Sequence, residues 1–347
     1  MSGGSLASSP GHPASDDARS DDGRRVDGNR MHRPLPNFFL VGAFKAGTTA
    51  FYQYLRQHPD VYLSPRKEPA YFVHESRTER LNPVWRRRHE ADAAALARYL
   101  KHPHWGPAQP SGPVTEWDDY LRLFEGARPG QAIGEGSVGC LWSRTAARAI
   151  SERIPDARIM MILRNPCDRA FSQFIGALNE TLNESFSEAI RRSASSPPPP
   201  LFDALNPLLD FGLYSEQVAR LLAYFPKDRV RIYLYDEFAR DPEGVMRDAF
   251  GFLGLRQDIP LDLSQRHNEP RVPRFPSVDR YLLRPAGAML RRVLPVDVRS
   301  ALNRLRYRQR DTLRMSSDDR RFLIEFYEED VRRLESIIGR DLSPWLV

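Results

Sequence analysis

The chain has 347 residues, of which 41% are hydrophobic and 28% are charged, a composition typical of a soluble globular protein. Its formal net charge of +6 favours polyanionic ligands, although a moderately basic surface explains it equally well. No apolar run approaches the roughly 18 residues of a membrane span and no signal segment opens the chain, so we expect a cytoplasmic protein. Its two cysteines, Cys140 and Cys167, are interpreted as core residues, and no metal site is predicted.

Residues 38–55 predict a strand, an anion-binding turn and a helix. A short apolar run ends at Gly42, and from Thr48 the apolar residues recur at helical spacing. The free N–H groups at a helix start attract an anion, and glycine lets the backbone approach it. Gly42 and Gly47 keep the glycine spacing of a nucleotide-triphosphatase phosphate loop, but Thr48 stands where that loop has its lysine. The lysine here is Lys45, inside the turn, where it would lie beside the terminal group of a bound phosphate ester.

The segment after this helix carries a candidate catalytic carboxylate. Residues 64–72 (SPRKEPAYF) form a loop with Glu68 at its centre. His58, between a helix end and a proline, is interpreted as a capping or packing residue rather than a catalytic one. Residues 73–118 contain Trp, Arg and His among prolines, and two interpretations are open: a ligand-binding lid, or a solvated insertion whose tryptophans pack on the core.

The second informative stretch begins with the apolar run at 158–163, which predicts a strand buried on both faces of a parallel sheet. A nucleotide triphosphatase commonly ends this strand in an aspartate that binds magnesium, whereas this chain has Arg164. An arginine at the carboxyl end of a strand, with Ser172 on the next helix, suits a second phosphate rather than a metal. Residues 131–142 predict another strand that ends in a polar turn, with Glu135 at its end.

The rest of the chain continues the alternation of strands and helices. Four consecutive prolines in 193–210 predict an extended flap, and an amphipathic helix is expected from Phe211 to about Phe225. A strand at 230–235 and a helix at about 242–253 follow. This alternation predicts an α/β fold, a single doubly wound domain over residues 34–347 with a central parallel sheet, after a disordered tail at 1–33.

The C-terminal part, 281–347, is predicted to be helical. Its basic segment 281–310 is interpreted as an amphipathic helix that caps the domain, with peripheral membrane or polyanion binding as the alternative. A charged helix at 316–337 should end at Gly339, and Trp345 should pack into the core.

Together these residues resemble the PAPS-dependent sulfotransferase family of bacterial type, whose donor is 3′-phosphoadenosine-5′-phosphosulfate (PAPS). The stretch from Gly42 to Leu55 resembles the 5′-phosphosulfate loop of the family, and residues 163–166 (LRNP) with Ser172 resemble its 3′-phosphate motif. The likeness extends from about residue 36 to residues 339–345 (GRDLSPW), more loosely at 73–118 and 193–210. It implies a P-loop-like fold and PAPS as the donor, with no metal required.

The resemblance also implies the residues of the site. Lys45 would be the catalytic lysine, and 5′-phosphate contacts would come from the loop. The donor-binding residues implied are Lys45, Ala46, Gly47, Thr48 and Thr49 at the 5′ end, Arg164 and Ser172 at the 3′ phosphate, Tyr214 or Ser215 at the adenine, and Arg271 or Arg274 at the 3′ phosphate.

Two residues are candidates for the general base. Cytosolic members of the family use a histidine, whereas glycan-modifying members use a glutamate in the loop after the first helix. Residues 67–72 (KEPAYF) resemble that loop, so Glu68 is the implied base, with Glu135 in reserve. The acceptor would be a hydroxyl or amine of a glycan, lipid or secondary metabolite, bound under the 73–118 lid and the 193–210 flap.

Two other functions are weighed. A P-loop kinase is disfavoured by Thr48 in place of lysine and by Arg164 in place of aspartate. A non-catalytic polyanion-binding or nucleotide-binding protein would use the basic segment 281–310. We expect no nucleic-acid partner, and the sequence predicts neither the identity of the acceptor nor the oligomeric state.

Overall fold

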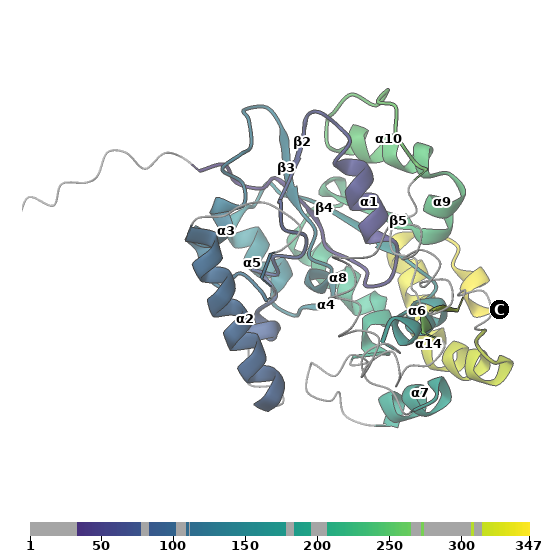
Figure 1. The fold of residues 1–347 in the computed structure, drawn as a ribbon. Coiled ribbons are helices and arrows are strands. Elements are labelled where there is room, and N and C mark those ends of the chain that lie inside the picture. Colours follow the sequence, from purple (N-terminus) through teal and green to yellow (C-terminus); the bar gives the residue numbers. More distant parts are fainter. Residues whose placement is uncertain are drawn as a thin grey trace, which may run out of the picture. The chain divides into compact units, whose positions relative to one another are not determined.

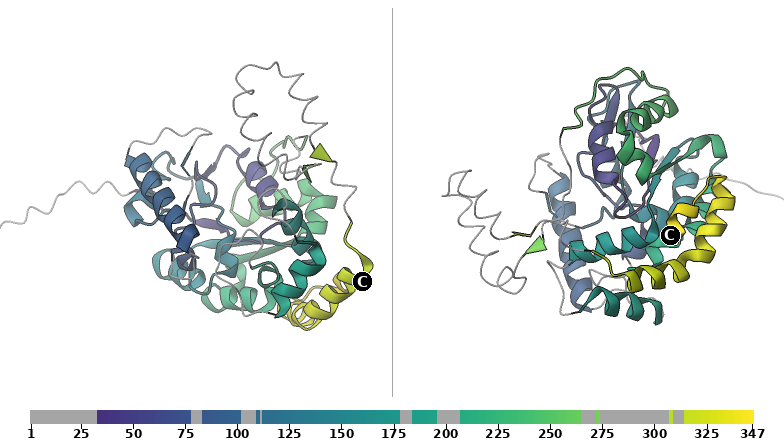
Figure 2. Two further views of the ribbon diagram at one scale, coloured as in Figure 1. Left: turned by 60° about the horizontal axis from the view of Figure 1, so that its bottom comes forward. Right: turned by 90° about the vertical axis from the view of Figure 1, so that its right-hand side faces the viewer.

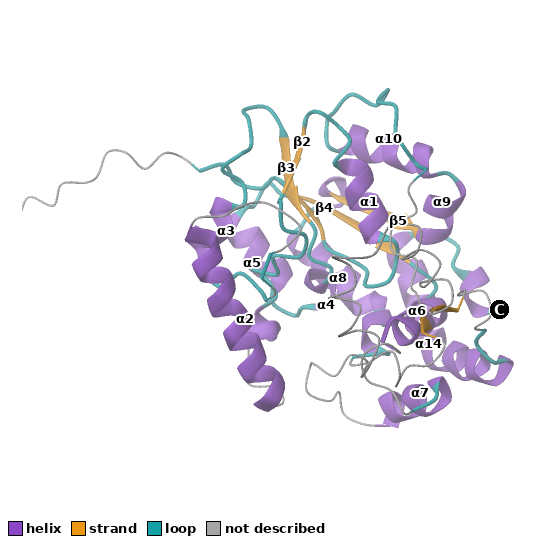
Figure 3. Ribbon diagram, in the orientation of Figure 1, coloured by secondary structure: helices purple, strands orange, loops and turns teal. Residues whose placement is uncertain are grey.

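A parallel five-stranded sheet forms the centre of the fold. The computed structural model describes residues 33–77, 83–101, 109–110, 112–177, 184–195, 207–264, 272–273, 307–308 and 314–347. The sheet has the order β2-β3-β1-β4-β5, with every neighbouring pair parallel. Figures 1 and 3 show it between helices; its strands are β1 (Phe38–Leu40), β2 (Val61–Leu63), β3 (Ala132–Glu135), β4 (Arg158–Leu163) and β5 (Val230–Leu234). The expected doubly wound α/β fold is confirmed.

The strands are short apolar runs that lose almost all their solvent contact. In β4, every residue from Ile159 to Leu163 is fully buried, as the uninterrupted apolar run predicts for a central parallel strand. Burying one such side chain favours folding by about 1.5–3 kcal/mol. At Gly134, a Cβ would lie 2.2 Å from Phe38 Cζ, so glycine permits the close packing of β3 on β1.

Helices cover both faces of the sheet (Figure 2). The chain passes from β1 to β2 in one direction and from β3 to β4 in the other, and right-handed crossovers therefore put the connecting helices on opposite faces. One group is α1 (Thr48–Leu55), α9 (Tyr235–Arg240) and α10 (Pro242–Phe252), which contact each other. The other group is α4 (Gly139–Trp142), α5 (Ala146–Arg153), α6 (Pro166–Ala177), α8 (Tyr214–Tyr224) and α14 (Ser317–Ile338).

The remaining described elements are the helices α2 (Pro83–Lys101), α3 (Trp117–Arg122) and α7 (Phe186–Ser195), the 3-10 turns η1 (His74–Arg77), η2 (Asp210–Gly212), η3 (Lys227–Arg229) and η6 (Ser343–Leu346), and a two-residue pair of β6 (Val272–Pro273) with β7 (Tyr307–Arg308). Within the described ranges, no helix is both long enough and apolar enough to cross a membrane.

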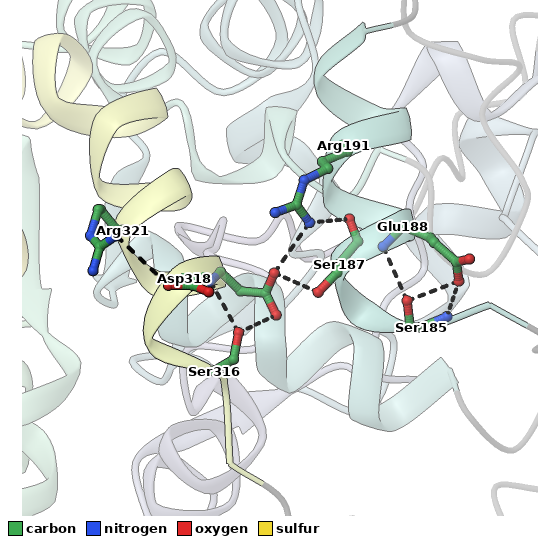
Figure 4. Close-up of polar contacts among 8 residues, drawn as sticks. Ser185, Ser187, Glu188, Arg191, Ser316, Asp318 and Arg321 are labelled. Atoms are coloured by element: carbon green, nitrogen blue, oxygen red, sulfur yellow. Dashed lines mark hydrogen bonds and ion pairs between the residues drawn. The ribbon is translucent and has the colours of Figure 1, made fainter.

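Helix α14 is capped at both ends and joined to α7. Ser316 accepts a hydrogen bond from the Asp319 N–H (3.1 Å) and donates to Asp319 Oδ2 (2.7 Å), a local pairing that starts the helix. From α7, Ser187 donates to Asp319 Oδ1 (2.6 Å) and Arg191 lies 3.4 Å from the same atom; Figure 4 shows Ser187, Arg191 and Ser316 at this contact. The left-handed Gly339 (φ 66°) ends α14. The expected terminal helix and its glycine stop are confirmed.

Two expected segments differ from the structure. Residues 193–195 belong to α7 and 207–212 form turns whose Leu208 and Leu209 are buried, so the extended flap expected at 193–210 is wrong at both ends. The helix expected from Phe211 begins at Tyr214, because η2 occupies 210–212. The disordered tail at 1–33, except residue 33 itself, the four prolines at 197–200 and the basic helix at 281–310, except residues 307–308, lie outside the described residues.

The 73–118 segment contributes to the core. Leu96 and Leu100 on α2 and Val114 after it are each 1% exposed, and Trp117 packs against the core cluster. This agrees with the interpretation as an insertion whose tryptophan docks on the core. A lid over the acceptor stays a prediction.

Candidate functional site

The carboxyl ends of β1, β3 and β4 meet at one edge of the sheet, and the loop after β1 is the first part of the site. We call residues 42–48 the glycine loop. It continues alongside β4, since the Ala43 N–H donates to Ile162 O (2.7 Å) and the Ile162 N–H donates to Gly42 O (2.9 Å). Gly47 has φ 86° at the N-cap of α1, and a Cβ there would lie 3.1 Å from the ring of Tyr235. Glycine therefore lets the loop turn tightly into the helix start.

Lys45 and Arg164 come together on this loop. Lys45 adopts a left-handed backbone (φ 63°), and its carbonyl accepts a hydrogen bond from Arg164 Nη1 (3.1 Å). The Arg164 guanidinium lies 4.5 Å from the ring centroid of Tyr235. A Cβ on Gly176 would lie 2.7 Å from Lys45 Nζ, so the ammonium rests against α6. Ser172 is four residues earlier on the same helix, hence on the same face as Gly176.

The other loop residues implied by the resemblance lie close by in the chain. Ala46 and Thr48 are buried, and Thr49 is half-buried on the first turn of α1. The first N–H groups of α1 and the cations Lys45 and Arg164 therefore lie together at the carboxyl ends of the strands. This arrangement is suited to binding an anion.

Tyr214 and Ser215, expected at the adenine, are buried beneath Arg164. Tyr214 is 0% exposed and its hydroxyl donates to Arg164 O (3.1 Å). Asp330 of α14 accepts from the Tyr214 N–H (2.7 Å) and from Ser215 Oγ (2.5 Å), and it caps the start of α8. In this structure Tyr214 supports the Arg164 backbone and Ser215 binds Asp330, and a direct contact of either residue with a nucleotide stays a prediction. Arg271 and Arg274 lie outside the described residues.

The loop at 64–72, which we call the glutamate loop, follows β2 at the same edge of the sheet. The Glu68 side chain is 41% exposed, and its Oε1 lies 2.9 Å from Lys67 Nζ. The Glu68 N–H donates to Gly136 O (3.0 Å) in the turn after β3. The carboxylate of Glu68 is therefore accessible, on a backbone attached to the neighbouring strand.

Glu135, at the end of β3, is the opposite case. It is 0% exposed, and its Oε2 accepts from Ser137 Oγ (2.6 Å). Burial raises the pKa of Glu135 to about 7; the Ser137 hydrogen bond opposes this rise, the charge of Glu68 adds to it, and Tyr120 opposes it. Glu68 is therefore the accessible carboxylate of the two, and its role as a base stays a prediction.

The raised pKa of Glu135 predicts a pH dependence of stability. From its ordinary value of 4.5 up to about 7, the folded protein binds a proton at Glu135 that the unfolded chain lacks. The free energy of unfolding contributed by this residue therefore falls as pH rises through that window. We expect wild type to lose stability relative to Glu135→Gln between pH 5 and pH 8, as measured by urea unfolding. Parallel pH profiles of the two proteins would contradict this.

The sequence did not predict the aromatic cluster that lies beside Lys45. Phe44, Trp142 and Phe211 are all half-buried, and the Phe211 ring centroid lies 5.2 Å from that of Phe44 and 5.5 Å from that of Trp142. Lys45 Nζ lies 5.6 Å from the Phe44 ring centroid. The three residues come from the glycine loop, α4 and η2, so no local pattern joins them. We call them the aromatic cluster.

Three other expectations concern histidine, cysteine and metal. His58 is 1% exposed, accepts from the Asp60 N–H through Nδ1 (3.0 Å) and pairs through Nε2 with Arg256 O (3.0 Å), which confirms a structural role. Cys140 and Cys167 are buried, as expected. Among the residues that the structure describes, no group of three His, Cys, Asp or Glu side chains could hold a metal ion.

A doubly wound parallel sheet with a cationic, glycine-containing turn between β1 and α1 defines an α/β protein of the P-loop-like class. Residues 36–258 match the sulfotransferase family, and the chain belongs to that family. A sulfotransferase from Alicyclobacillus acidocaldarius is a structural neighbour with 30% sequence identity and a TM-score of 0.63, covering 90% of this chain and 99% of its own. The recognition of the family from sequence is confirmed.

Curated relatives are similar over shorter shares of their length. Human heparan sulfate glucosamine 3-O-sulfotransferase 6 is 26% identical over 228 residues, 65% of this chain and 54% of that protein. Bovine bifunctional heparan sulfate N-deacetylase/N-sulfotransferase 2 is 25% identical over 319 residues, 90% of this chain and 31% of that protein. The chain thus spans about half the length of the first relative and about a third of the second.

Proposed function

We propose that the protein transfers the sulfuryl group of PAPS to a hydroxyl or amine of an acceptor. The observation that carries this is the hydrogen bond from Arg164 Nη1 to the backbone carbonyl of Lys45. It brings the residue expected at the 3′ phosphate next to the loop that holds the residue expected at the 5′ phosphate. Membership of the sulfotransferase family supports the reaction class.

Each step of the reaction has a residue at the same edge of the sheet. The acceptor oxygen or nitrogen gives its proton to the Glu68 carboxylate and forms a bond to sulfur, while the bond from sulfur to the 5′-phosphate oxygen breaks. The leaving phosphate gains negative charge, which the Lys45 ammonium and the N–H groups of the glycine loop stabilise. Much of the rate enhancement comes from holding the two oxygens in line, as in phosphoryl transfer.

The acceptor side is proposed from the aromatic cluster. The aromatic cluster lies beside Lys45, which contacts its Phe44 ring. Small-molecule sites are commonly lined by aromatic side chains with few polar groups. Relatives named for heparan sulfate act on a glycan, so a glycan is one acceptor class for this chain, beside a lipid or a secondary metabolite.

A calorimetric titration tests the donor. We expect PAP, the desulfated product, to bind without magnesium, and ATP to bind far more weakly. Tight, magnesium-dependent ATP binding would favour a kinase instead. Mass spectrometry of cell extracts incubated with enzyme and PAPS, searched for an added SO₃, then identifies the acceptor.

Arg164→Ala is expected to raise the donor KM by roughly 10- to 100-fold, because a charged hydrogen bond contributes about 1.5–3 kcal/mol. Donor KM and PAP affinity are measured together. Arg158→Ala is the matched control, since Arg158 lies at the other end of β4 and also donates to a backbone carbonyl, that of Leu253 (3.0 Å). Unchanged donor affinity in Arg164→Ala would remove the phosphate role.

Phe211→Ala is expected to raise the acceptor KM about tenfold while leaving the donor KM unchanged, because it removes the central ring of the aromatic cluster. Steady-state kinetics with the acceptor found in the extract screen measure both constants. Phe252→Ala, which also removes a half-buried phenyl ring, serves as the control. An equal rise in both KM values would point to a general disturbance of the site.

A further inference from the structure

The glutamate loop has an unusual backbone at the residue assigned as the base. Glu68 has φ 61° and Ala70 has φ 54°, both in the left-handed region, and Pro69 stands between them. Residues with a Cβ adopt this conformation at an energetic cost, and a following proline restricts Glu68 further. Such a conformation persists only where neighbouring groups determine it.

The turn after β3 supplies those neighbouring groups. The Glu68 N–H donates to Gly136 O (3.0 Å), and the Ala70 N–H donates to Ser137 Oγ (2.9 Å). The two left-handed residues are therefore each attached to one of two consecutive residues of that turn. The position of the Glu68 carboxylate depends on how firmly Ser137 is oriented.

Glu135 orients Ser137. The Ser137 hydroxyl donates its only proton to Glu135 Oε2 (2.6 Å), which leaves its lone pairs for the Ala70 N–H. Glu135 and Ser137 are 0% and 2% exposed, so water does not compete for these bonds. The result is a continuous chain from Glu135 through Ser137 to the backbone of the glutamate loop.

The surroundings of Glu135 favour a role in positioning the glutamate loop over a role as the base. Besides Ser137, the groups that face it are Tyr120 of α3, Tyr52 of α1, Cys140 of α4 and Glu68 itself. Its Oε1 and the Tyr120 hydroxyl are both buried and interact with each other, and no other hydrogen-bond partner of either group lies in the described part of the chain. A proton on Oε1 leaves Oε2 free to accept from Ser137, so the support works in both protonation states.

We propose that Glu135 and Ser137 are positioning residues, which hold the glutamate loop so that the Glu68 carboxylate faces the acceptor. The catalytic part of this inference rests on the proposed function, whereas the support of the loop does not. The two parts therefore need separate measurements.

Hydrogen exchange tests the support of the loop without any substrate. Ser137→Ala removes the acceptor of the Ala70 N–H, and exchange of the amide at residue 70 is expected to accelerate roughly tenfold, the equivalent of one lost hydrogen bond. Glu135→Ala should have the same effect, while Glu135→Gln, which keeps an oxygen for Ser137, should restore protection. Ser143→Ala is the matched control, because the buried Ser143 hydroxyl also donates to a carboxylate, Glu75 Oε2 (2.6 Å), and accepts from the Thr145 and Ala146 N–H groups at the start of α5.

Release of labelled sulfate from PAPS, with water as the acceptor, tests the catalytic consequence. We expect Ser137→Ala to lower kcat about 10- to 100-fold with the donor KM within twofold of wild type, since a small displacement of a catalytic group has this scale of effect. Glu135→Gln should keep kcat within about threefold of wild type, because its amide oxygen still orients Ser137.

The outcomes separate the two claims. Unchanged exchange at residue 70 in Ser137→Ala would overturn the support. A loss of activity in Glu135→Gln with a fully protected loop would overturn it as well and give Glu135 a direct part in the proton transfer. Faster exchange in a protein whose wild type neither binds PAP nor releases sulfate would leave the support intact and refute the proposed function.

Discussion

Replacing Lys45 with alanine is expected to lower kcat for sulfuryl transfer about 10²- to 10³-fold, the scale seen when one charge-stabilising donor is removed. Lys45 lies in the glycine loop with its carbonyl attached to Arg164 and its ammonium against α6. The negative charge that develops on the leaving phosphate would lose its nearest cation. The ground-state complex keeps the N–H groups of the loop, so the donor KM should change less than kcat.

Initial rates at saturating PAPS measure this effect. Lys227→Ala is the matched control, because Lys227 is an exposed lysine on η3. Circular dichroism checks that the variant is folded. Wild-type turnover in Lys45→Ala would mean that another cation receives the leaving charge.

Glu68→Gln is expected to lower kcat by about 10²- to 10⁴-fold, the range that a general base supplies. The amide keeps the size of the side chain and the backbone bond to Gly136, but it cannot accept the acceptor proton. PAP affinity should stay as in wild type, because the donor residues are on other loops.

The comparison with Glu135→Gln decides the assignment of the base. Calorimetry with PAP and single-turnover transfer are measured for both variants. Loss of transfer in Glu135→Gln, with Glu68→Gln active, would move the base to the end of β3. Loss in both would mean that the two carboxylates act together.

Sequence patterns sufficed for the parts of the site that are local. The glycine loop between β1 and α1, and Arg164 between β4 and α6, each depend on an apolar run followed by a helical pattern, and both stretches fold as expected. Tyr214 was different. Its burial follows from Asp330, 116 residues away, and from η2, neither of which a local pattern reveals.

Exposure separated the two carboxylates, and sequence does not encode it directly. Glu68 lies in the loop after β2 and Glu135 ends β3, so position in the chain places both at the same edge of the sheet, and only the resemblance of residues 67–72 put Glu68 first. Packing of α1, α3 and α4 buries Glu135, whereas Glu68 keeps 41% of its side chain exposed. The aromatic cluster escaped prediction for a similar reason, because its rings meet only after three distant segments fold.

The contacts beneath Arg164 bear on when the site is completed during synthesis. Asn165 Nδ2 donates to Trp345 O (3.3 Å), 180 residues further along the chain, and Asp330 caps the helix that starts at Tyr214. A ribosome would have to release α14 and η6 before the residues around Arg164 have their full set of partners. We therefore expect a nascent chain that ends before Asp330 to have its parallel strands but to retain little PAP on an affinity resin.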